Sequence, residues 1–591
     1  TVQSHTITDY SNQAWAFRAM DDATMRSANP WLYTDPDKAN SLPVSVLPVG
    51  GFYRETKYSM ESYDFRATAS YNNVFGEDHI VNLFGGMETN AVNREKTWFN
   101  GVGMQYEMGM LPSYDYLYFK QGNEENAGYY SVDRTRQREV SFFGTGTYSY
   151  KGRYTLNGTV RYEGSNKLGK SRKARWLPTW NVSAAWNAHE EEFWQSFRDV
   201  VSNMTLKASY SLTADRGPAS VSNSKAIINS YNTWRPFTSM KESGLILSSV
   251  ENSELTYEKK HELNIGAEIG FIDNRINIEA DWYTRNNFDL IGLIYTKGTG
   301  GQLAKFANVA SMKSSGVEFT VSTRNIKTKD FSWNTDFIFS HTKNEVTDLQ
   351  SNASVMDMIS GNGFAMEGYP VRALFSMDFQ GLNENGYPTF INEKGQLTVS
   401  DINFQEQLKK DHLVYEGPTD PTMTGSLGNI FRYKGFTLNA FITYSFGNVI
   451  RLDPVFHNVY SDLDAMPREF INRWTTGGDE KVTNVPVIAD KRANQQDPYL
   501  SYAYNAYNYS TERIAKGDFI RMKELSLSYN FPKKMISKLK VNDLSLKIQA
   551  TNLFLIYSDK KLNGQDPEFF NTGGVASPVP RQFTLTLRLG I

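Results

Sequence analysis

The last nine residues of the sequence, Phe583-Thr584-Leu585-Thr586-Leu587-Arg588-Leu589-Gly590-Ile591, alternate between large apolar side chains and polar or small ones. Successive side chains of a β-strand point to opposite faces, so this segment predicts a strand with one apolar and one polar face. About ten residues with this pattern span an outer membrane, with the apolar face toward lipid and the polar face toward the lumen of a barrel. The segment therefore predicts a transmembrane β-strand.

The same alternation recurs in hairpins joined by short turns along the whole chain. The predicted strand pairs are 63–71 with 81–87, 140–148 with 154–162, 176–186 with 206–213, 263–271 with 276–282, 317–323 with 331–339 and 422–433 with 436–446, followed by strands through 517–523 and 552–554. Two connections, 189–197 and 532–539, predict short helices. Long polar segments at 93–135, 215–256, 344–420, 450–515 and 557–579 predict loops on the other side. We place the strand-like segment 373–379 in an external loop. Short periplasmic turns opposite long extracellular loops are typical of an all-β, antiparallel outer-membrane barrel.

We count about fifteen membrane strands in this pattern. If the last strand runs down to the periplasm, the first hairpin also begins with a downward strand, and an upward strand must precede it. A bacterial barrel closes with an even number of strands, so an odd count predicts a missing N-terminal part. Residues Thr1–Thr6 read as a strand and carry no signal peptide. We therefore interpret residues 1–591 as the C-terminal portion of a longer barrel protein.

The composition excludes several other classes of protein. The 62 Lys and Arg residues balance 64 Asp and Glu residues, which argues against a nucleic-acid-binding protein. The chain has no cysteine, which excludes disulfides, thiol catalysis and Cys-ligated zinc. Mean hydropathy is -0.50, as expected when only every second side chain meets lipid. Aromatic residues make up 14% of the chain, which favours the aromatic girdles of a membrane barrel.

A series of motifs in the hairpins resembles the SusC/RagA family of TonB-dependent outer-membrane transporters of Bacteroidetes. The motifs are Arg161-Tyr162-Glu163-Gly164-Ser165-Asn166, Trp176-Leu177-Pro178-Thr179-Trp180-Asn181, Leu206-Lys207-Ala208-Ser209-Tyr210, Leu255-Thr256-Tyr257-Glu258, Asn308-Val309-Ala310, Ser315-Gly316-Val317-Glu318, Phe331-Ser332-Trp333-Asn334, Asn472-Arg473-Trp474-Thr475-Thr476-Gly477-Gly478, Gly517-Asp518-Phe519-Ile520-Arg521 and Asn552-Leu553-Phe554. Each motif alone is weak, but their order and spacing make the resemblance specific. Thr213-Ala214-Asp215 and the terminal Ile591 depart from the family pattern locally.

The resemblance implies a barrel of about 22 strands around an N-terminal plug, of which the plug and first strands are absent from this sequence. It further implies a SusD-like lipoprotein lid, energy from the TonB complex through the missing N-terminal part, and a dimer of transporter–lipoprotein pairs. The implied function is uptake of nutrients, oligosaccharides or oligopeptides, across the outer membrane of a Gram-negative bacterium. The resemblance implies neither an enzyme nor a cofactor.

Aromatic residues in the long loops are the candidate substrate contacts, because flat aromatic faces beside polar groups suit sugar rings and peptide side chains. These candidates are Trp98, Tyr114, Tyr116, Trp234 and Phe237. Packing of the loops on one another or on a lid is the alternative interpretation. We interpret the lumen-side Arg66 and Arg161 as parts of charge ladders across neighbouring strands. His189-Glu190-Glu191-Glu192 lacks the second histidine of a zinc-protease helix, and we interpret it as a solvated periplasmic helix. No metal site is predicted.

Two other functions compete with active import. A passive porin or a protein-export barrel would share the strand alternation, although porins have shorter loops and fewer strands. A soluble glycan-binding or hydrolytic β-protein would shield its strands on both faces, which the repeated alternation at membrane length contradicts. A hydrolase would also need a pair of carboxylates, and pairing is not visible in one sequence.

Overall fold

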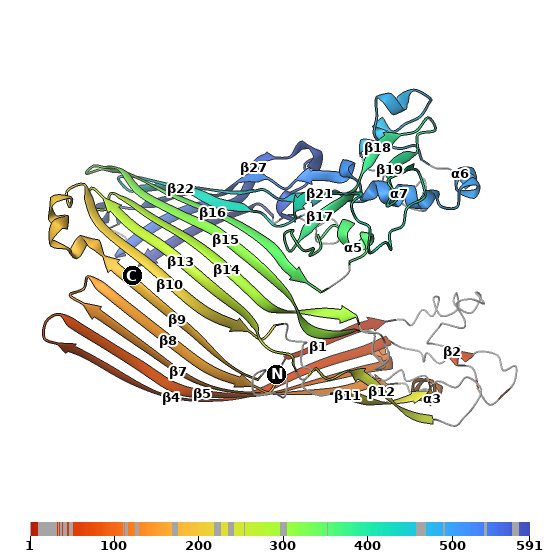
Figure 1. The fold of residues 1–591 in the computed structure, drawn as a ribbon, viewed down its shortest axis with the longest axis horizontal. Coiled ribbons are helices and arrows are strands. Elements are labelled where there is room, and N and C mark those ends of the chain that lie inside the picture. Colours follow the sequence, from red (N-terminus) through yellow and green to blue (C-terminus); the bar gives the residue numbers. More distant parts are fainter. Residues whose placement is uncertain are drawn as a thin grey trace.

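One antiparallel sheet dominates the chain (Figure 1). The computed structural model describes residues 2–9, 32–33, 35, 38, 44–45, 51–109, 111–112, 116–124, 129–167, 175–217, 226–233, 242–252, 254–295, 304–350, 353–456, 468–488, 491–536, 541–569, 578 and 580–590. Among them the sheet has 17 strands, of which β6 (Leu111–Pro112) has two residues. The others are β1 (Val2–Asp9), β4 (Gly51–Phe75), β5 (His79–Gln105), β7 (Tyr130–Tyr150), β8 (Tyr154–Ser165), β9 (Trp176–Asn187), β10 (Val201–Asp215), β13 (Glu258–Phe271), β14 (Ile276–Tyr295), β15 (Ala304–Lys327), β16 (Phe331–Leu349), β22 (Met423–Tyr433), β23 (Phe436–Phe446), β26 (Phe519–Asn530), β27 (Asp543–Ser558) and β28 (Gln582–Gly590).

These strands form an up-and-down arrangement, in which each pairs with its neighbours in sequence, from β1 with β4 to β27 with β28. Short turns gather at one end of the sheet and long connections at the other, as Figure 1 shows. In the turn after β7, Lys151 and Gly152 have φ angles of 55° and 65°. Two positive φ values give the mirror-image turn whose twist matches that of the flanking strands. The predicted division into turns and loops is confirmed.

The register keeps apolar side chains on one face from strand to strand. One continuous row across seven strands consists of Leu585, Ile548, Leu527, Leu438, Phe431, Trp333 and Ile326. Aromatic pairs on this face form two belts. The belt near the short turns includes His79 with Tyr150, whose ring centroids are 5.0 Å apart. The belt near the long connections includes Tyr162 with Trp176, also at 5.0 Å. The predicted aromatic girdles are therefore confirmed.

Fifteen of the strands cross the apolar band, as the sequence predicted. β1 pairs with β4 only from Gly51 to Tyr58, which is beyond the band on the side of the long connections. Residues 59–75 of β4 therefore have no partner on that edge among the described residues, and no described pairing joins β28 to β1 or β4. The described sheet is therefore open between β4 and β28. We call this open edge the seam.

Several strands extend further than the sequence predicted. β5 continues to Gln105 and β7 begins at Tyr130, inside the segment 93–135 that was predicted as a loop. Above the lipid band both faces of a strand meet water, so the alternation that reveals a membrane strand is lost there. The predicted helix at 189–197 consists of two 3-10 helices, η2 (Ala188–Glu190) and η3 (Glu192–Ser196). The helix predicted at 532–539 is α8 (Lys533–Ile536), and residues 537–540 lie outside the described part.

None of the described helices is long and apolar enough to cross a membrane.

Two long connections, 350–422 and 447–518, fold together into what we call the loop domain (Figure 1). Its elements are α5 (Val355–Ile359), β17 (Ala373–Met377), β18 (Phe379–Leu382), β19 (Pro388–Ile391), β20 (Leu397–Thr398), β21 (Leu413–Pro418), β24 (Val449–Arg451), α6 (Lys491–Gln496), α7 (Leu500–Asn508) and β25 (Ile514–Lys516). β17 pairs with β21 rather than with a wall strand, so the external placement of 373–379 is confirmed. Met377, Phe390 and Phe456 pack in its core with Tyr504 and Tyr507 of α7.

The remaining short elements also lie in long connections. They are the strands β2 (Leu32–Tyr33), β3 (Val44–Ser45), β11 (Ile227–Thr233) and β12 (Glu242–Ser249) and the helix α3 (Tyr116–Glu124).

A buried arginine connects the two halves of the loop domain. The Arg451 side chain on β24 donates from Nη1 to the Ser510 carbonyl oxygen at 2.9 Å and from Nη2 to the Phe375 carbonyl oxygen at 2.6 Å. Arg451 is 6% exposed, and burial lowers its pKa to about 10, so the group stays protonated at neutral pH. A buried cation that donates to carbonyl groups of both connections fixes their relative position, and removing it takes a charged donor from each, although Ser510 still accepts from the Arg513 backbone N–H at 3.0 Å.

The motif around Trp474 forms a tight turn in the same domain. The Asp479 carboxylate accepts hydrogen bonds from the backbone N–H groups of Thr475 and Thr476 at 2.9 and 3.0 Å. These backbone N–H groups hold the pKa of Asp479 below its usual range. The Trp474 ring lies where a Cβ on Gly386 would fall, 2.5 Å away, and Gly386 has a φ of +76°. The motif therefore joins the second long connection to the first.

We expect the Arg451→Met variant to loosen the loop domain while leaving the barrel wall intact. Loss of the two buried hydrogen bonds from the guanidinium should lower the free energy of unfolding of the domain by about 2–4 kcal/mol. Hydrogen exchange should rise in residues 353–422, 447–456 and 491–516 and stay unchanged in the wall strands, such as β7 and β8. Arg451→Lys is the control, because it keeps the positive charge and loses only the two-nitrogen geometry of the guanidinium group. Unchanged exchange in Arg451→Met would contradict the assigned role.

We expect the turn at 472–483 to open in acid. The folded pKa of Asp479 is depressed, so its contribution to stability is complete above the unfolded pKa, near 3.8, and is lost as the pH falls through the lower folded value. Exchange rates of 472–483, corrected for the intrinsic pH effect, should be constant from about pH 7 to pH 5 and rise below about pH 4. In the Asp479→Asn, Glu480→Gln double variant, residues 472–483 should exchange fast both above pH 5 and below pH 4. A wild-type turn that stays protected at pH 2 would refute this account.

Candidate functional site

The polar face of the wall carries a row of alternating charges near the long connections. Arg66 on β4 lies 3.9 Å from Glu88 on β5, and Glu88 pairs with Arg161 on β8 at 2.6 Å. Arg161 also pairs with Glu163 at 2.8 Å. Ser141 on β7 donates to Glu88 at 3.2 Å. Neighbouring strands place these groups side by side, so the interpretation of Arg66 and Arg161 as parts of a charge ladder is confirmed.

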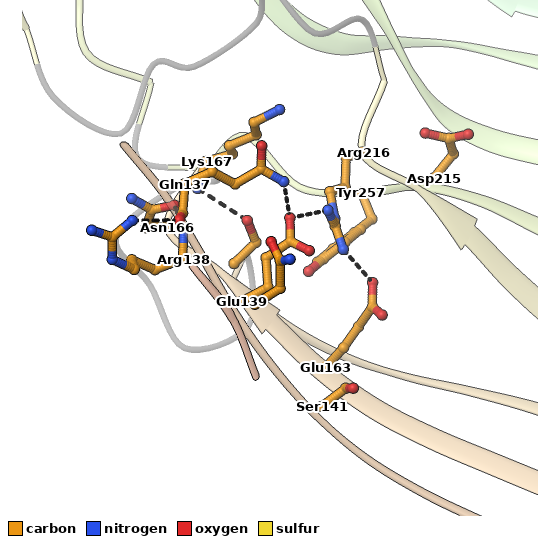
Figure 2. Close-up of polar contacts among 12 residues, drawn as sticks. Gln137, Arg138, Glu139, Ser141, Glu163, Asn166, Lys167, Asp215, Arg216 and Tyr257 are labelled. Carbon is orange, nitrogen blue, oxygen red and sulfur yellow. Dashed lines mark hydrogen bonds and ion pairs between the residues drawn. The ribbon is translucent and has the colours of Figure 1, made fainter. Parts of the chain in front are cut away.

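Arg216, just after β10, extends the ladder around the wall (Figure 2). Its guanidinium binds Glu139 on β7 and lies 3.5 Å from Glu163 on β8. Tyr257, which immediately precedes β13, points into the same group and is 1% exposed. Burial raises the pKa of the Tyr257 phenol to about 12, so it stays neutral. We call Arg66, Glu88, Arg161, Glu163, Arg216 and Glu139 the charge ladder.

The charge ladder balances itself, because its three arginines meet three glutamates. Every charge in it has a partner from another strand or connection, so a ligand would have to displace an existing ion pair to use one. Such exposed pairs contribute about 0–1 kcal/mol each to stability. The charge ladder therefore stabilises the wall near the long connections. It presents hydrogen-bonding groups to the lumen, and its charges sum to zero.

Two of the sequence motifs meet just behind the ladder. The Asn308 side chain donates from Nδ2 to the Thr256 carbonyl oxygen at 3.0 Å and accepts from the Thr256 backbone N–H at 3.0 Å. Glu258 accepts from the Ile291 backbone N–H at 2.8 Å. These reciprocal bonds hold the segment that carries Tyr257 against β14 and β15. Both motifs thus have a structural role.

The loop domain carries a pocket of about 490 Å³. Its wall is strongly polar and includes Arg468, Glu469, Asn472, Glu512, Arg513 and Lys561. Arg513 is 6% exposed and pairs with Glu469 at 2.5 Å. Binding sites are usually concave with a few fixed polar groups, so this pocket is the best-formed candidate for a substrate contact in the loop domain. Its residues lie in segments without periodicity, which the sequence marks only as the long polar loops 450–515 and 557–579.

The candidate aromatic residues are only partly within the described chain. Tyr114, Trp234 and Phe237 lie outside the described residues. Trp98 is half-buried on β5, and Tyr116 begins α3 with 73% of its surface exposed.

The neighbours of Tyr116 pack on one another instead. The Phe119 ring lies 5.5 Å from Tyr118 and 5.0 Å from Tyr129. The loop-packing interpretation therefore holds for Tyr118 and Phe119, while Tyr116 remains open to solvent.

One sequence interpretation at the turns is wrong in part. Glu191 was interpreted as a solvated residue, but it accepts from Arg153 at 3.1 Å, from the Tyr154 hydroxyl at 2.5 Å and from the Trp186 indole N–H at 3.2 Å. Three donors from two hairpins converge there, a tertiary arrangement that local sequence does not reveal. Among the described residues, no group of three or more His, Asp or Glu side chains could hold a metal ion.

Comparison with known proteins identifies the family. A family model described as the β-barrel of TonB dependent receptor-like proteins matches residues 4–463. TonB-dependent receptor P3 of Formosa agariphila is 24% identical over 531 residues, covering 87% of this chain and 49% of that protein. TonB-dependent receptor SusC of Bacteroides thetaiotaomicron is 25% identical over 478 residues, covering 77% and 44%. The chain spans about half the length of the relatives it matches.

The fold agrees with these sequence relatives. A solved structure of the RagAB peptide transporter superposes with a TM-score of 0.74 at 21% identity, covering 91% of this chain and 56% of that one. The matched proteins are receptors and transporters rather than enzymes, as the sequence predicted. With its lipid-facing rows, its two aromatic belts and a family match over most of its length, the chain belongs to the TonB-dependent receptor-like β-barrels of the outer membrane.

Proposed function

We propose that this chain is the C-terminal barrel portion of an energy-coupled importer that takes up oligosaccharides or oligopeptides. The observation that carries the proposal is the family match over residues 4–463, on a wall whose polar face leads to a large external loop domain. The similarity to SusC and to the RagAB peptide transporter supports a glycan or peptide as substrate class. Transport would require no covalent chemistry.

We further propose that a plug and the first barrel strands belong to the same protein, before residue 1. Unpaired backbone groups are costly in lipid, so the free edge of β4 at residues 59–75 needs a partner strand. A barrel of about 22 strands is wide enough to leak unless a plug fills it. Both requirements are met if further strands close the seam and a plug fills the barrel.

The proposed partners are the TonB complex, which would act on the plug, and a SusD-like lipoprotein over the external loops. A dimer of transporter–lipoprotein pairs belongs to the same proposal. The resemblance to the SusC/RagA family and the similarity in fold to the RagAB peptide transporter support these partners. The loop domain has a core of its own and offers such a partner a preformed surface.

The aromatic residues singled out from the sequence are our proposed substrate contacts: Trp98, Tyr114, Tyr116, Trp234 and Phe237. The 73% exposure of Tyr116 at the start of α3 supports this role, because its ring is free to stack on a ligand. A passive porin or a protein-export barrel is the alternative function. The two can be separated by their energy requirement.

We expect uptake by the full-length protein to stop when TonB is removed. Cells that carry the protein receive a labelled mixture of oligosaccharides and oligopeptides, and mass spectrometry follows the depletion of each class from the medium. Depletion of one class should cease in a strain without TonB and in cells whose proton gradient is collapsed, because opening of a plugged barrel needs external work. A strain without the protein sets the background. Uptake that persists without TonB would favour the passive porin.

We expect Tyr116→Ala to weaken substrate capture by the full-length importer. Loss of one stacking surface should raise the KM for uptake about fivefold, equivalent to about 1 kcal/mol, with little change in maximal rate. Phe193→Ala is the matched control, since Phe193 is an aromatic side chain at the opposite end of the barrel with 55% of its surface exposed. Equal effects of the two substitutions, or none from Tyr116→Ala, would remove Tyr116 from the site.

A further inference from the structure

Three arginines follow one another on the lipid-facing side of β7. Arg134, Arg136 and Arg138 occupy every second position, continuing the face that carries Val140 and Phe142. Figure 2 shows Arg138 on the opposite side of the strand from Glu139, which belongs to the charge ladder. These arginines therefore face away from the lumen, and transported substrate does not pass them.

The height of these residues corresponds to the edge of the hydrocarbon layer. From the lower belt, where His79 pairs with Tyr150, β5 runs twelve residues to Ala91, which pairs with Arg138. A rise of about 3.3 Å per residue at a tilt of about 40° makes this a height of about 30 Å, the thickness of the hydrocarbon core. Arg138 thus lies at the level of the outer-leaflet headgroups, and Arg136 and Arg134 lie further out.

The arginines line a groove with a volume of about 400 Å³, whose other lining residues are Ser59, Glu61, Asn93, Arg94, Glu95 and Thr135. Glu95 forms an ion pair with Arg134, in which Oε2 and Nε are 2.7 Å apart. Arg138 donates from Nη2 to the Asn93 side-chain oxygen at 2.7 Å and from Nη1 to the carbonyl oxygens of Gln137 and Val92 at 2.7 and 3.2 Å, which keeps its guanidinium against the sheet.

Arg136 and Arg138 form no ion pair with any residue in the described part of the chain. Glu61, which pairs with Asn93 in the sheet, is the other carboxylate beside them. With Arg94 of β5, four arginines stand against two glutamates, which leaves the groove with a net positive charge.

Guanidinium groups at this depth match one kind of ligand. Arginine presents a planar fork that binds phosphate oxygens in pairs, and residues two apart on a strand are about 7 Å apart, so both can reach one headgroup. We propose that Arg136 and Arg138, with Arg134 beside them, bind the phosphate of an anionic lipid in the outer leaflet of the membrane. The acyl chains of this lipid would lie along Val140 and Phe142 below.

Native mass spectrometry of the full-length protein in detergent tests the proposal. The probes are dioleoyl phosphatidic acid, dioleoyl phosphatidylcholine and inorganic phosphate. The wild type should bind phosphatidic acid more tightly than phosphatidylcholine. The triple variant Arg134→Gln, Arg136→Gln, Arg138→Gln should bind phosphatidic acid about thirtyfold more weakly, roughly fivefold for each of the two unpaired arginines, with phosphatidylcholine binding unchanged.

The matched control removes three positive charges from the polar face of the same barrel. Lys96, Lys207 and Lys547 alternate with lipid-facing residues on β5, β10 and β27, and the variant with glutamine at all three should bind phosphatidic acid like the wild type. The double variant Arg136→Lys, Arg138→Lys keeps the charge and loses the fork, and it should give an intermediate affinity. It also tests the proposal if the triple variant does not fold, as judged by heat-dependent migration on gels.

Two results would overturn the proposal. Equal affinity of the wild type and the arginine variants for phosphatidic acid would mean that the groove binds no lipid phosphate. Displacement of phosphatidic acid by an equal concentration of inorganic phosphate would mean that the groove takes the free anion rather than the lipid.

Discussion

A backbone N–H or C=O group that enters lipid finds no water to bond, so each membrane strand must be paired along both edges. In this chain antiparallel pairing in a fixed register meets that requirement for every wall strand except along the seam. Because side chains alternate, the register also decides what each face presents. Phe142 pairs with Tyr162 on the lipid side, while Ser141 pairs with Glu163 on the other. A slip of one residue would exchange the two faces, so pairing and chemistry are fixed together.

The distribution of charge follows from this separation. On the polar face Arg66 and Arg161 have glutamates on neighbouring strands, and each charge gains from a partner. On the lipid face of β7 the first arginine is Arg138, beyond the outer aromatic belt. The loop domain obeys neither restriction, so it folds like a small soluble domain, with its own apolar core and a buried Arg451. The lumen, the lipid and the aqueous exterior thus constrain the placement of charges in three different ways along one chain.

Sequence reasoning succeeded wherever one of these rules leaves a local period. The alternation in 583–591 predicted β28, and alternation together with the family motifs predicted the fifteen strands that cross the lipid band. It failed where the period ends, since the external halves of β5 and β7 have water on both sides. For the site, Arg66 and Arg161 were correctly interpreted as members of a ladder. Contacts made between distant segments left no local signal.

Arg216 with Glu139 and the three donors around Glu191 are such contacts, and only tertiary structure brings them together.

The motifs that carry the family resemblance turn out to hold the chain together. Asn308 bonds Thr256 in both directions, and Trp474 covers Gly386 between two loops. Substitution of residues with such structural contacts is restricted. The same holds for side chains that contact lipid or a neighbouring strand. Under the function that we propose, substrate specificity would be set at positions without such contacts, for example the exposed Tyr116 or the polar pocket beside Arg513. One wall could then serve importers of different nutrients, because recognition would reside in the loops that the wall positions.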